Sequence, residues 1–226
     1  MDERTEQICR EHPDEANIEP RWPALMAVLA IGGLYLAIPP QLALGPRWLP
    51  LLIIGILMVP TIFTHRRGYY TANHVLGIAV SCVNTVFMLV SLGLLLHGLV
   101  HGAEKPAQML RSAVALWTTN VLVFAVWYWR LDAGGPHIRD RFVGHHRGSF
   151  LFPQMTMSSE ELERQGMSGW SPGFVDYLFL AFNTSTALSP ADTAVLEPWA
   201  KILCMVQSAI SLSVIAFIAA RAVNIL

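Results

Sequence analysis

The sequence predicts an all-α integral membrane protein with about five transmembrane helices plus one short re-entrant, pore-like helix, six apolar segments in total. Hydrophobic residues make up 54% of the chain and charged residues only 14%, whereas a soluble domain carries about 25% charge. The apolar residues gather into runs that polar or proline-bearing turns separate. One of these runs is too short to cross a bilayer, and this predicts the re-entrant helix.

Composition divides the chain into four regions. Residues 1–20 form an acidic polar tail, typical of a soluble leader, because a secretory signal begins with basic residues followed by an apolar run. Residues 21–131 hold a four-helix transmembrane region. Residues 132–172 form a polar connecting loop rich in His and Arg, and residues 173–226 hold the pore-like helix, its loop and a final transmembrane helix.

The first four apolar segments differ in how well they match a membrane span of about 20 residues. Two are marginal in length: Trp22–Ile38 ends at a Pro-Pro pair, and Trp48–Thr64 carries Pro60. Two are long enough to span: His74–Leu99 and Met109–Leu131.

The second half of the chain begins with the polar loop. Within this loop, Ser158 or Ser159 is expected to cap a short helix that has acids in its first turn. Phe174–Leu188 is apolar over only about fifteen residues, a length typical of re-entrant or interfacial segments. Trp199–Asn224 is long enough to span.

The positions of Lys and Arg favour a cytoplasmic N-terminus. With that orientation, and with Phe174–Leu188 re-entrant, the Arg66-Arg67 turn and most arginines of the polar loop also face the cytoplasm. The expected location is therefore a cell membrane, crossed several times, with the lipid bilayer as the main partner.

Several function classes have no support in the sequence. The net charge of −1 gives no basic field for nucleic acid. No Ser-His-Asp elbow, P-loop or GxGxxG is present, so we expect neither an enzyme nor a cofactor. Histidines and acids do gather in the polar loop, but their spacing matches no metal site, and a solvated or pH-sensing loop is favoured over metal binding. These residues are Asp132, His137, Asp140, His145 and His146.

Hydroxyl side chains and one acid follow the short apolar helix and form the candidate pore or ion-binding set. The set comprises Thr184, Ser185, Thr186, Ser189 and Asp192. In a symmetric oligomer, Asp192 would form a ring of acids that attracts cations. An ordinary capped turn is the alternative explanation of the same residues. The final helix adds Gln207, Ser208 and Ser211 on one face, where they either line a water path or bond neighbouring helices.

This arrangement resembles the pore module of tetrameric cation channels. Thr184 and Thr186 match the pore-helix threonines, Ala187-Leu188-Ser189-Pro190-Ala191 the five filter positions, Asp192 the acid after the filter, and Trp199-Ala200-Lys201 the start of the inner helix. The chain also resembles bacterial multipass membrane-protein families of unknown function that have similar C-terminal ends. The resemblance implies a homo-oligomer, a tetramer if the protein is channel-like, and an inorganic ion as ligand.

The matched loop departs from a potassium filter. That filter needs glycine at two positions where φ is positive. Ser189 and Ala191 occupy those positions, and Pro190 fixes φ near −65° between them. We therefore expect a channel-like protein with a degenerate filter that is not of the potassium type. The alternatives are a non-conducting scaffold or partner subunit that keeps the pore-module fold and, with less support, a small-solute carrier.

Overall fold

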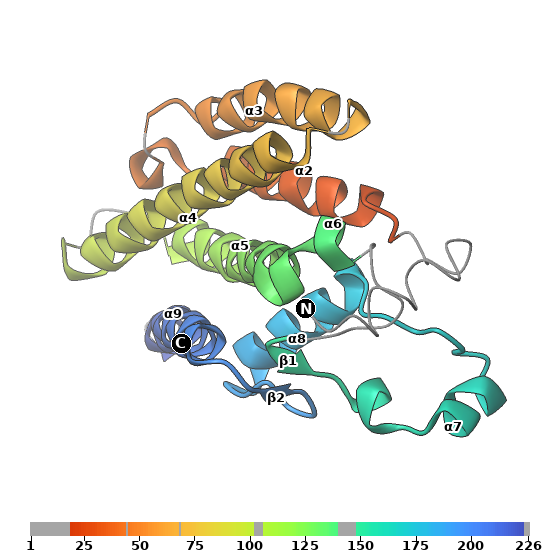
Figure 1. The fold of residues 1–226 in the computed structure, drawn as a ribbon. Helices are drawn as coiled ribbons and strands as arrows, with labels where there is room; N and C mark the ends of the chain where they lie inside the picture. The colour runs from red at the N-terminus through yellow and green to blue at the C-terminus, as the bar shows by residue number, and fades with distance from the viewer. Residues whose placement is uncertain (1–18, 44, 68, 102–105, 140–147, 224–226) are drawn as a thin grey trace.

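The computed structural model describes residues 19–43, 45–67, 69–101, 106–139 and 148–223, and its fold is all-α apart from one pair of two-residue strands (Figure 1). Each predicted apolar segment forms a helix, which confirms the all-α fold class. These helices are α2 (Trp22–Ala37), α3 (Leu49–Arg66), α4 (Tyr70–His101), α5 (Pro106–Leu131), α8 (Phe174–Thr186) and α9 (Pro198–Val223).

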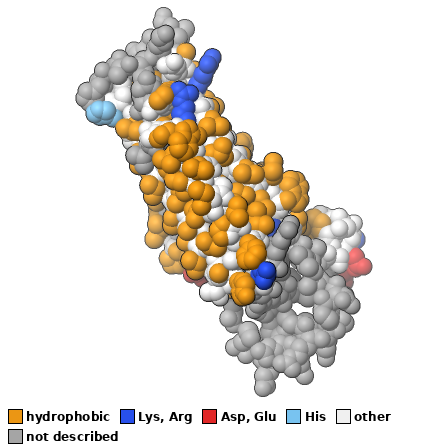
Figure 2. Space-filling view, turned by 90° about the horizontal axis from the view of Figure 1, so that it is seen from above, with side chains coloured by type: hydrophobic (Ala, Val, Ile, Leu, Met, Phe, Trp, Pro, Cys, Tyr) orange, Lys and Arg blue, Asp and Glu red, His pale blue; other side chains and the backbone are white. Residues whose placement is uncertain are grey.

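Within the described residues, three helices are long and apolar enough to cross a membrane: Thr71–Gly98, Ala107–Gly134 and Pro198–Ala220. This is compatible with a membrane location. The helices α2 and α3 are apolar but shorter. Figure 2 shows apolar side chains over the middle of one face, with Lys and Arg side chains toward both ends of the described surface.

Proline positions agree with these helices. Pro106 and Pro198 stand at the first position of α5 and α9, where a helix needs no backbone N–H donor. Pro60 lies inside α3, where it removes a donor. Thr64 Oγ1 donates to the carbonyl oxygen of Pro60 at 2.8 Å, a bond from a side chain to the backbone one turn earlier in the same helix.

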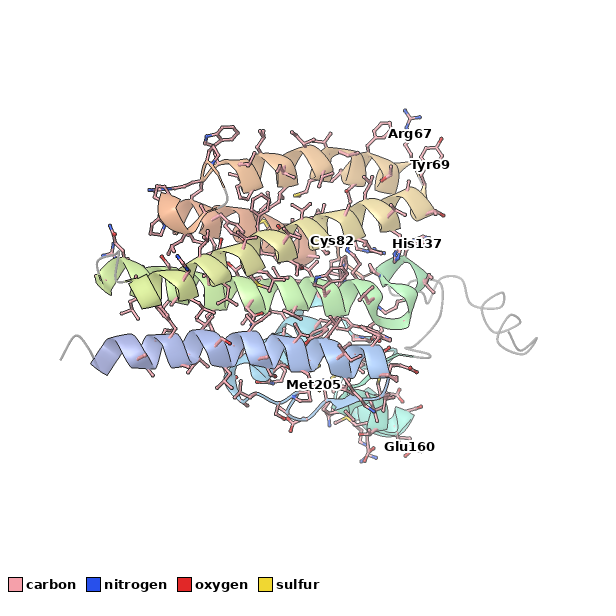
Figure 3. All side chains as sticks on the ribbon, turned by 90° about the vertical axis from the view of Figure 1, so that its left-hand side faces the viewer. Arg67, Tyr69, Cys82, His137, Glu160 and Met205 are labelled. Carbon is pink, nitrogen blue, oxygen red and sulfur yellow. The ribbon has the colours of Figure 1, made fainter. Side chains whose placement is uncertain are left out.

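Helix α5 lies at the centre of the bundle, with α2 and α4 on one side and α8 and α9 on the other (Figure 1). Its fully buried side chains include Leu116, Phe124 and Tyr128. At one end of the bundle α3 and α5 finish, while α2, α4, α8 and α9 begin. We call it the Asp132 end, after the buried acid that follows α5. Figure 3 shows Arg67, Tyr69 and His137 together at this end.

Short elements form the connection between α5 and α8: η3 (Asp132–Gly134), α6 (Pro136–Arg139), β1 (Phe150–Leu151), η4 (Pro153–Thr156) and α7 (Ser159–Arg164). The predicted cap is Ser158: the backbone N–H of Glu161 donates to its hydroxyl at 3.3 Å. The carboxylate of Glu161 accepts from the backbone N–H of Ser158 at 2.8 Å, which completes a capping box. A further short element, η2 (Pro40–Leu42), follows α2.

Candidate functional site

Helix α8, the turn after it and the start of α9 form a hairpin that enters and leaves at the Asp132 end. The ring of Phe174, at the start of α8, lies 5.9 Å from the ring of Trp129 near the end of α5. The strand before α9, β2 (Ala194–Val195), pairs antiparallel with β1. The backbone N–H of Ser149, next to β1, donates to the carboxylate of Asp132 at 2.5 Å. Both ends of the hairpin therefore lie beside the same end of α5.

The hairpin reaches only about half of the way along α5. Helix α8 has 13 residues, which corresponds to about 20 Å. In its last turn, Ser185 Oγ lies 3.5 Å from the amide nitrogen of Asn120. Asn120 precedes the end of α5 by about 17 Å of helix, and the whole of α5 is about 39 Å long. The turn that follows α8 thus begins near the middle of the bundle's length.

Gln207 of α9 is the centre of a buried polar cluster beside this turn. Its amide nitrogen donates to the carbonyl oxygen of Ala181 at 2.7 Å and to the hydroxyl of Ser185 at 2.8 Å. Its amide oxygen accepts from the hydroxyl of Tyr128 at 2.5 Å. The side chains of Gln207, Tyr128 and Ser185 are fully buried. One residue of α9 therefore bonds both α5 and α8.

Asn120 of α5 extends this cluster toward the next turn of α9. Its amide nitrogen lies 2.8 Å from the hydroxyl of Ser211 and 3.3 Å from the carbonyl oxygen of Gln207. The name Gln207 cluster denotes the five buried side chains of Asn120, Tyr128, Ser185, Gln207 and Ser211. Such interhelical hydrogen bonds are typical of polar residues that hold membrane helices together.

Two further candidate residues lie at the edge of this cluster. The hydroxyl of Thr184 is fully buried and donates to the carbonyl oxygen of Leu180 in its own helix at 2.8 Å. The half-buried Ser208 donates to the carbonyl oxygen of Thr184 at 3.4 Å. Of the eight residues singled out from the sequence, five thus lie at the contact between α5, α8 and α9.

The remaining three candidates, Thr186, Ser189 and Asp192, are exposed in the single chain. Thr186 is the last residue of α8, and the turn that bears the other two has positive φ at Leu188 (54°) and Ala191 (53°). Of the two positions matched to filter glycines, Ala191 has positive φ and Ser189 does not. The turn is therefore a strained local bend with exposed hydroxyls and one exposed carboxylate, and its backbone differs from the glycine-bearing filter.

A second polar cluster, which sequence reasoning missed, lies at the Asp132 end. Tyr177 of α8 donates its hydroxyl to the carboxylate of Asp132 at 2.7 Å. Arg139 donates to the carbonyl oxygens of Asp132 (2.9 Å) and Trp129 (2.8 Å), and pairs with the carboxylate of Glu19 at 3.0 Å. Trp129 donates its indole N–H to the other oxygen of Glu19 at 2.5 Å. These five side chains are buried, and we call them the Asp132 cluster.

The charges of the Asp132 cluster are stabilised by hydrogen bonds and by an aromatic ring. The guanidinium of Arg139 lies 5.1 Å from the ring centre of Tyr177, within the range of a cation–π contact. Burial raises the pKa of Tyr177 well above its usual value, and the negative charge of Asp132 acts in the same direction. The Tyr177 hydroxyl therefore stays protonated and remains a donor to Asp132 at all physiological pH values.

The tight turn after α5 brings Arg139 back to the end of that helix. Ala133, Gly134 and Gly135 all have positive φ, at 49°, 79° and 94°. A Cβ atom on Gly135 would lie 2.8 Å from the carbonyl oxygen of Arg130, so only glycine fits. An acid directly after a helix, followed by a Gly-Gly-Pro turn and an arginine, is the sequence signal that could have indicated this cluster.

In the part of the chain that the structure describes, no group of three or more His, Cys, Asp or Glu side chains is arranged to hold a metal ion. Asp140, His145 and His146 of the predicted His-rich loop lie outside the described residues.

Comparisons with protein-family models, with curated proteins and with solved structures found no match for this chain. The resemblance to a channel pore module therefore stays a prediction. The candidate site is defined by its own geometry: a buried Gln207 cluster, an exposed turn near mid-depth, and a charged cluster at the end where the hairpin enters.

Proposed function

We propose that this chain forms an oligomeric, channel-like protein of the bacterial plasma membrane, with five spans and α8 as a re-entrant helix. In this proposal residues 187–192 border a water-filled space. The observation that carries the proposal is the position of the turn: it is exposed in the single chain, yet it begins about halfway along the central helix α5.

A turn at this depth cannot face lipid. Backbone N–H and C=O groups that lack partners in hydrocarbon cost several kcal/mol each, so non-helical backbone occurs there only inside protein or beside water. Ala187, Leu188, Ser189 and Asp192 are all exposed. In a membrane these residues therefore need either a second copy of the chain or an aqueous cavity next to them.

The chemistry of the turn favours cations over anions. Asp192 adds one carboxylate per copy, and a ring of such acids raises the local concentration of cations. Ser189 supplies a hydroxyl next to it. Arg and Lys, the side chains that favour anions, are absent from residues 187–192. Two features argue against potassium-type selectivity. Pro190 restricts the backbone of the turn, and of the two positions matched to filter glycines only Ala191 has positive φ.

The exposed face of α8 gives a second copy a place to bind. Val175, Phe179 and Phe182 are 65%, 59% and 45% exposed, while the opposite face of the helix is buried against α5 and α9. Contact between copies through this face would bring the turns of neighbouring chains together, which is the arrangement that a ring of Asp192 side chains needs.

A non-conducting scaffold is the second candidate, and the Gln207 cluster favours it. Gln207 and Ser211, which were candidates for a pore wall, bond α5 and α8 of their own chain and are fully buried. In this alternative the hairpin keeps its shape through these bonds alone, and the oligomer passes no ions.

Water access to the turn is the first test. In a chain without its native cysteines, Ser189→Cys should react with a membrane-impermeant maleimide in liposomes, because the reactive thiolate forms only in water. Met205→Cys is the matched control: Met205 lies on α9, is 62% exposed and faces outward, as Figure 3 shows. We expect it to face lipid and to react at least about ten-fold more slowly. Equal protection of both cysteines would contradict the proposal.

Ion flux then separates the two candidates. Purified protein in liposomes should pass monovalent cations, and Asp192→Asn should lower the cation flux or the cation preference. Glu197→Asn removes an exposed acid from the segment between the turn and α9, and is expected to leave the flux unchanged. A water-accessible turn without flux in any tested salt would favour the scaffold.

A further inference from the structure

Arg130, in the last turn of α5, holds its guanidinium against the backbone of α4. A Cβ atom built on Gly77 would lie 1.5 Å from one terminal nitrogen of Arg130 and 2.0 Å from its central carbon. The guanidinium therefore occupies the space that the missing side chain of Gly77 leaves. Its Nε atom is buried and has no hydrogen-bond partner among the described residues.

Two other positive or protonatable groups lie near the last turn of α5. The guanidinium carbons of Arg130 and Arg21 lie 5.6 Å and 5.9 Å from the ring centre of Trp129, so two cations share one indole. His74 of α4 is exposed near the end of α5. A Cβ atom built on Gly135 would lie 3.7 Å from Nδ1 of His74 and 2.8 Å from the backbone carbonyl oxygen of Arg130.

No described acid forms an ion pair with Arg130. The carboxylate of Glu19 accepts from Trp129 and pairs with Arg139. The carboxylate of Asp132 accepts from Ser149 and Tyr177. A guanidinium that is largely removed from water without a counter-charge is unfavourable, so an anion that binds beside it would restore a large part of the lost hydration energy.

The chemistry and the location indicate the kind of anion. The fork of an arginine matches the oxygens of a phosphate, and a second arginine beside it strengthens the match. Arg130 lies four residues before the end of the candidate span Ala107–Gly134, where lipid headgroups are found. Basic pockets between membrane helices are known binding places for anionic lipid headgroups. With the expected cytoplasmic N-terminus, this end faces the anionic inner leaflet.

We propose that Arg130, Arg21 and His74, at the junction of α2, α4 and α5, form a binding site for a phosphate group, supplied by the headgroup of an anionic phospholipid. Arg130 makes the central contact because its guanidinium lies against Gly77 of α4 and pairs with no acid among the described residues. Gly77 provides the room for its guanidinium, and Trp129 holds the two arginines on one ring. The site is separate from the turn at residues 187–192 and does not depend on conduction.

Thermal unfolding of the full-length chain in detergent tests the site, with phosphatidylglycerol, phosphatidylcholine or inorganic phosphate added. Phosphatidylglycerol at about 100 times its Kd should raise the Tm by about 5 to 10 °C, and phosphatidylcholine by much less. Arg130→Gln should abolish most of this shift. Arg111→Gln is the matched control, because Arg111 is exposed near the opposite end of the same helix.

Two further arms keep the result decisive. Without added lipid, Arg130→Gln should unfold at the wild-type Tm or higher, because it removes a buried cation, so a lost shift cannot be blamed on misfolding. If inorganic phosphate alone raises the Tm as much as phosphatidylglycerol does, the site binds phosphate, but its ligand is a soluble phosphate and the lipid part of the proposal is wrong. If no phosphate-bearing compound raises the Tm, or if Arg130→Gln keeps the full shift with phosphatidylglycerol, the proposal is overturned.

Discussion

Replacing Gln207 with leucine tests whether the Gln207 cluster holds the hairpin against α5. Leucine has a similar volume, so the cavity contribution is small and the lost hydrogen bonds dominate. The change removes the bonds of Gln207 to Ala181, Ser185 and Tyr128. Hydrogen bonds between membrane helices average about 0.6 kcal/mol each, which gives roughly 2 kcal/mol for the three.

The loss of unfolding free energy will be larger if a hydrogen-bond partner of Gln207 finds no other partner in the variant. The hydroxyl of Tyr128 is fully buried and donates to Gln207, and a buried donor that loses its acceptor costs about 1–3 kcal/mol. Ser185 still lies within reach of Asn120. We therefore expect Gln207→Leu to lower the free energy of unfolding by about 2 to 4 kcal/mol.

Reversible unfolding in mixed detergent micelles, followed by tryptophan fluorescence, measures this free energy. The double-mutant cycle with Tyr128→Phe should show a coupling of about 1 kcal/mol, because the two side chains share a bond. Ser213→Ala serves as the control: Ser213 is exposed on the same helix and bonds only to its own backbone at Ala209, so its loss should stay within about 0.5 kcal/mol. An unchanged or higher stability of Gln207→Leu would refute the reasoning and indicate that Gln207 faces water.

Three more predictions address local features. Ala191→Gly should raise stability by up to about 1 kcal/mol in the same unfolding assay, because Ala191 has a φ of 53° that glycine adopts without strain. Ser158→Ala should cost about 1 kcal/mol of local stability, seen as faster hydrogen exchange in α7. The backbone N–H and hydroxyl of Ser158 lower the pKa of Glu161 below 4.5, so its stabilising contribution is complete above pH 4.5 and is lost as the pH falls through the lowered pKa. Gly77→Ala should lower the Tm, since the new methyl group would displace the guanidinium of Arg130.

Hydrophobic patterning was sufficient to locate the helices. Segment length predicted that Phe174–Leu188 is a short helix, and α8 covers Phe174–Thr186. Spacing placed Gln207 and Ser211 on one face of the final helix. Hydroxyl and acid placement predicted Ser158 or Ser159 as the cap of α7, and the structure selects Ser158. These features depend on residues close together in the chain, and local physics determines them. The count of five membrane spans stays a prediction, because three helices within the described residues meet the length and apolarity expected of a span.

Partners that are distant in the sequence could not be predicted. Periodicity shows that Gln207 lies on a polar face of its helix. It does not show that Tyr128, which is 79 residues earlier, contacts that face. Residues 127–130 read Trp-Tyr-Trp-Arg, a pattern typical of an anchor at the membrane interface, yet Tyr128 and Trp129 are buried between helices. Glu19 and Arg139 are 120 residues apart, and pairing between single charges at such separations leaves no local pattern.

In the proposed arrangement of five spans, the hairpin of α8 determines on which sides of the membrane the two ends of the bundle emerge. Because α8 enters and leaves at the Asp132 end, it adds no crossing, and α9 starts at the same end as α2. The far end of α9 therefore emerges on the side opposite to the start of α2. A reporter enzyme fused after α9 would sit in the other compartment from one fused before α2, whereas a fully crossing α8 would place both in the same compartment. Comparing the compartments of these two fusions therefore distinguishes a re-entrant α8 from one that crosses the membrane.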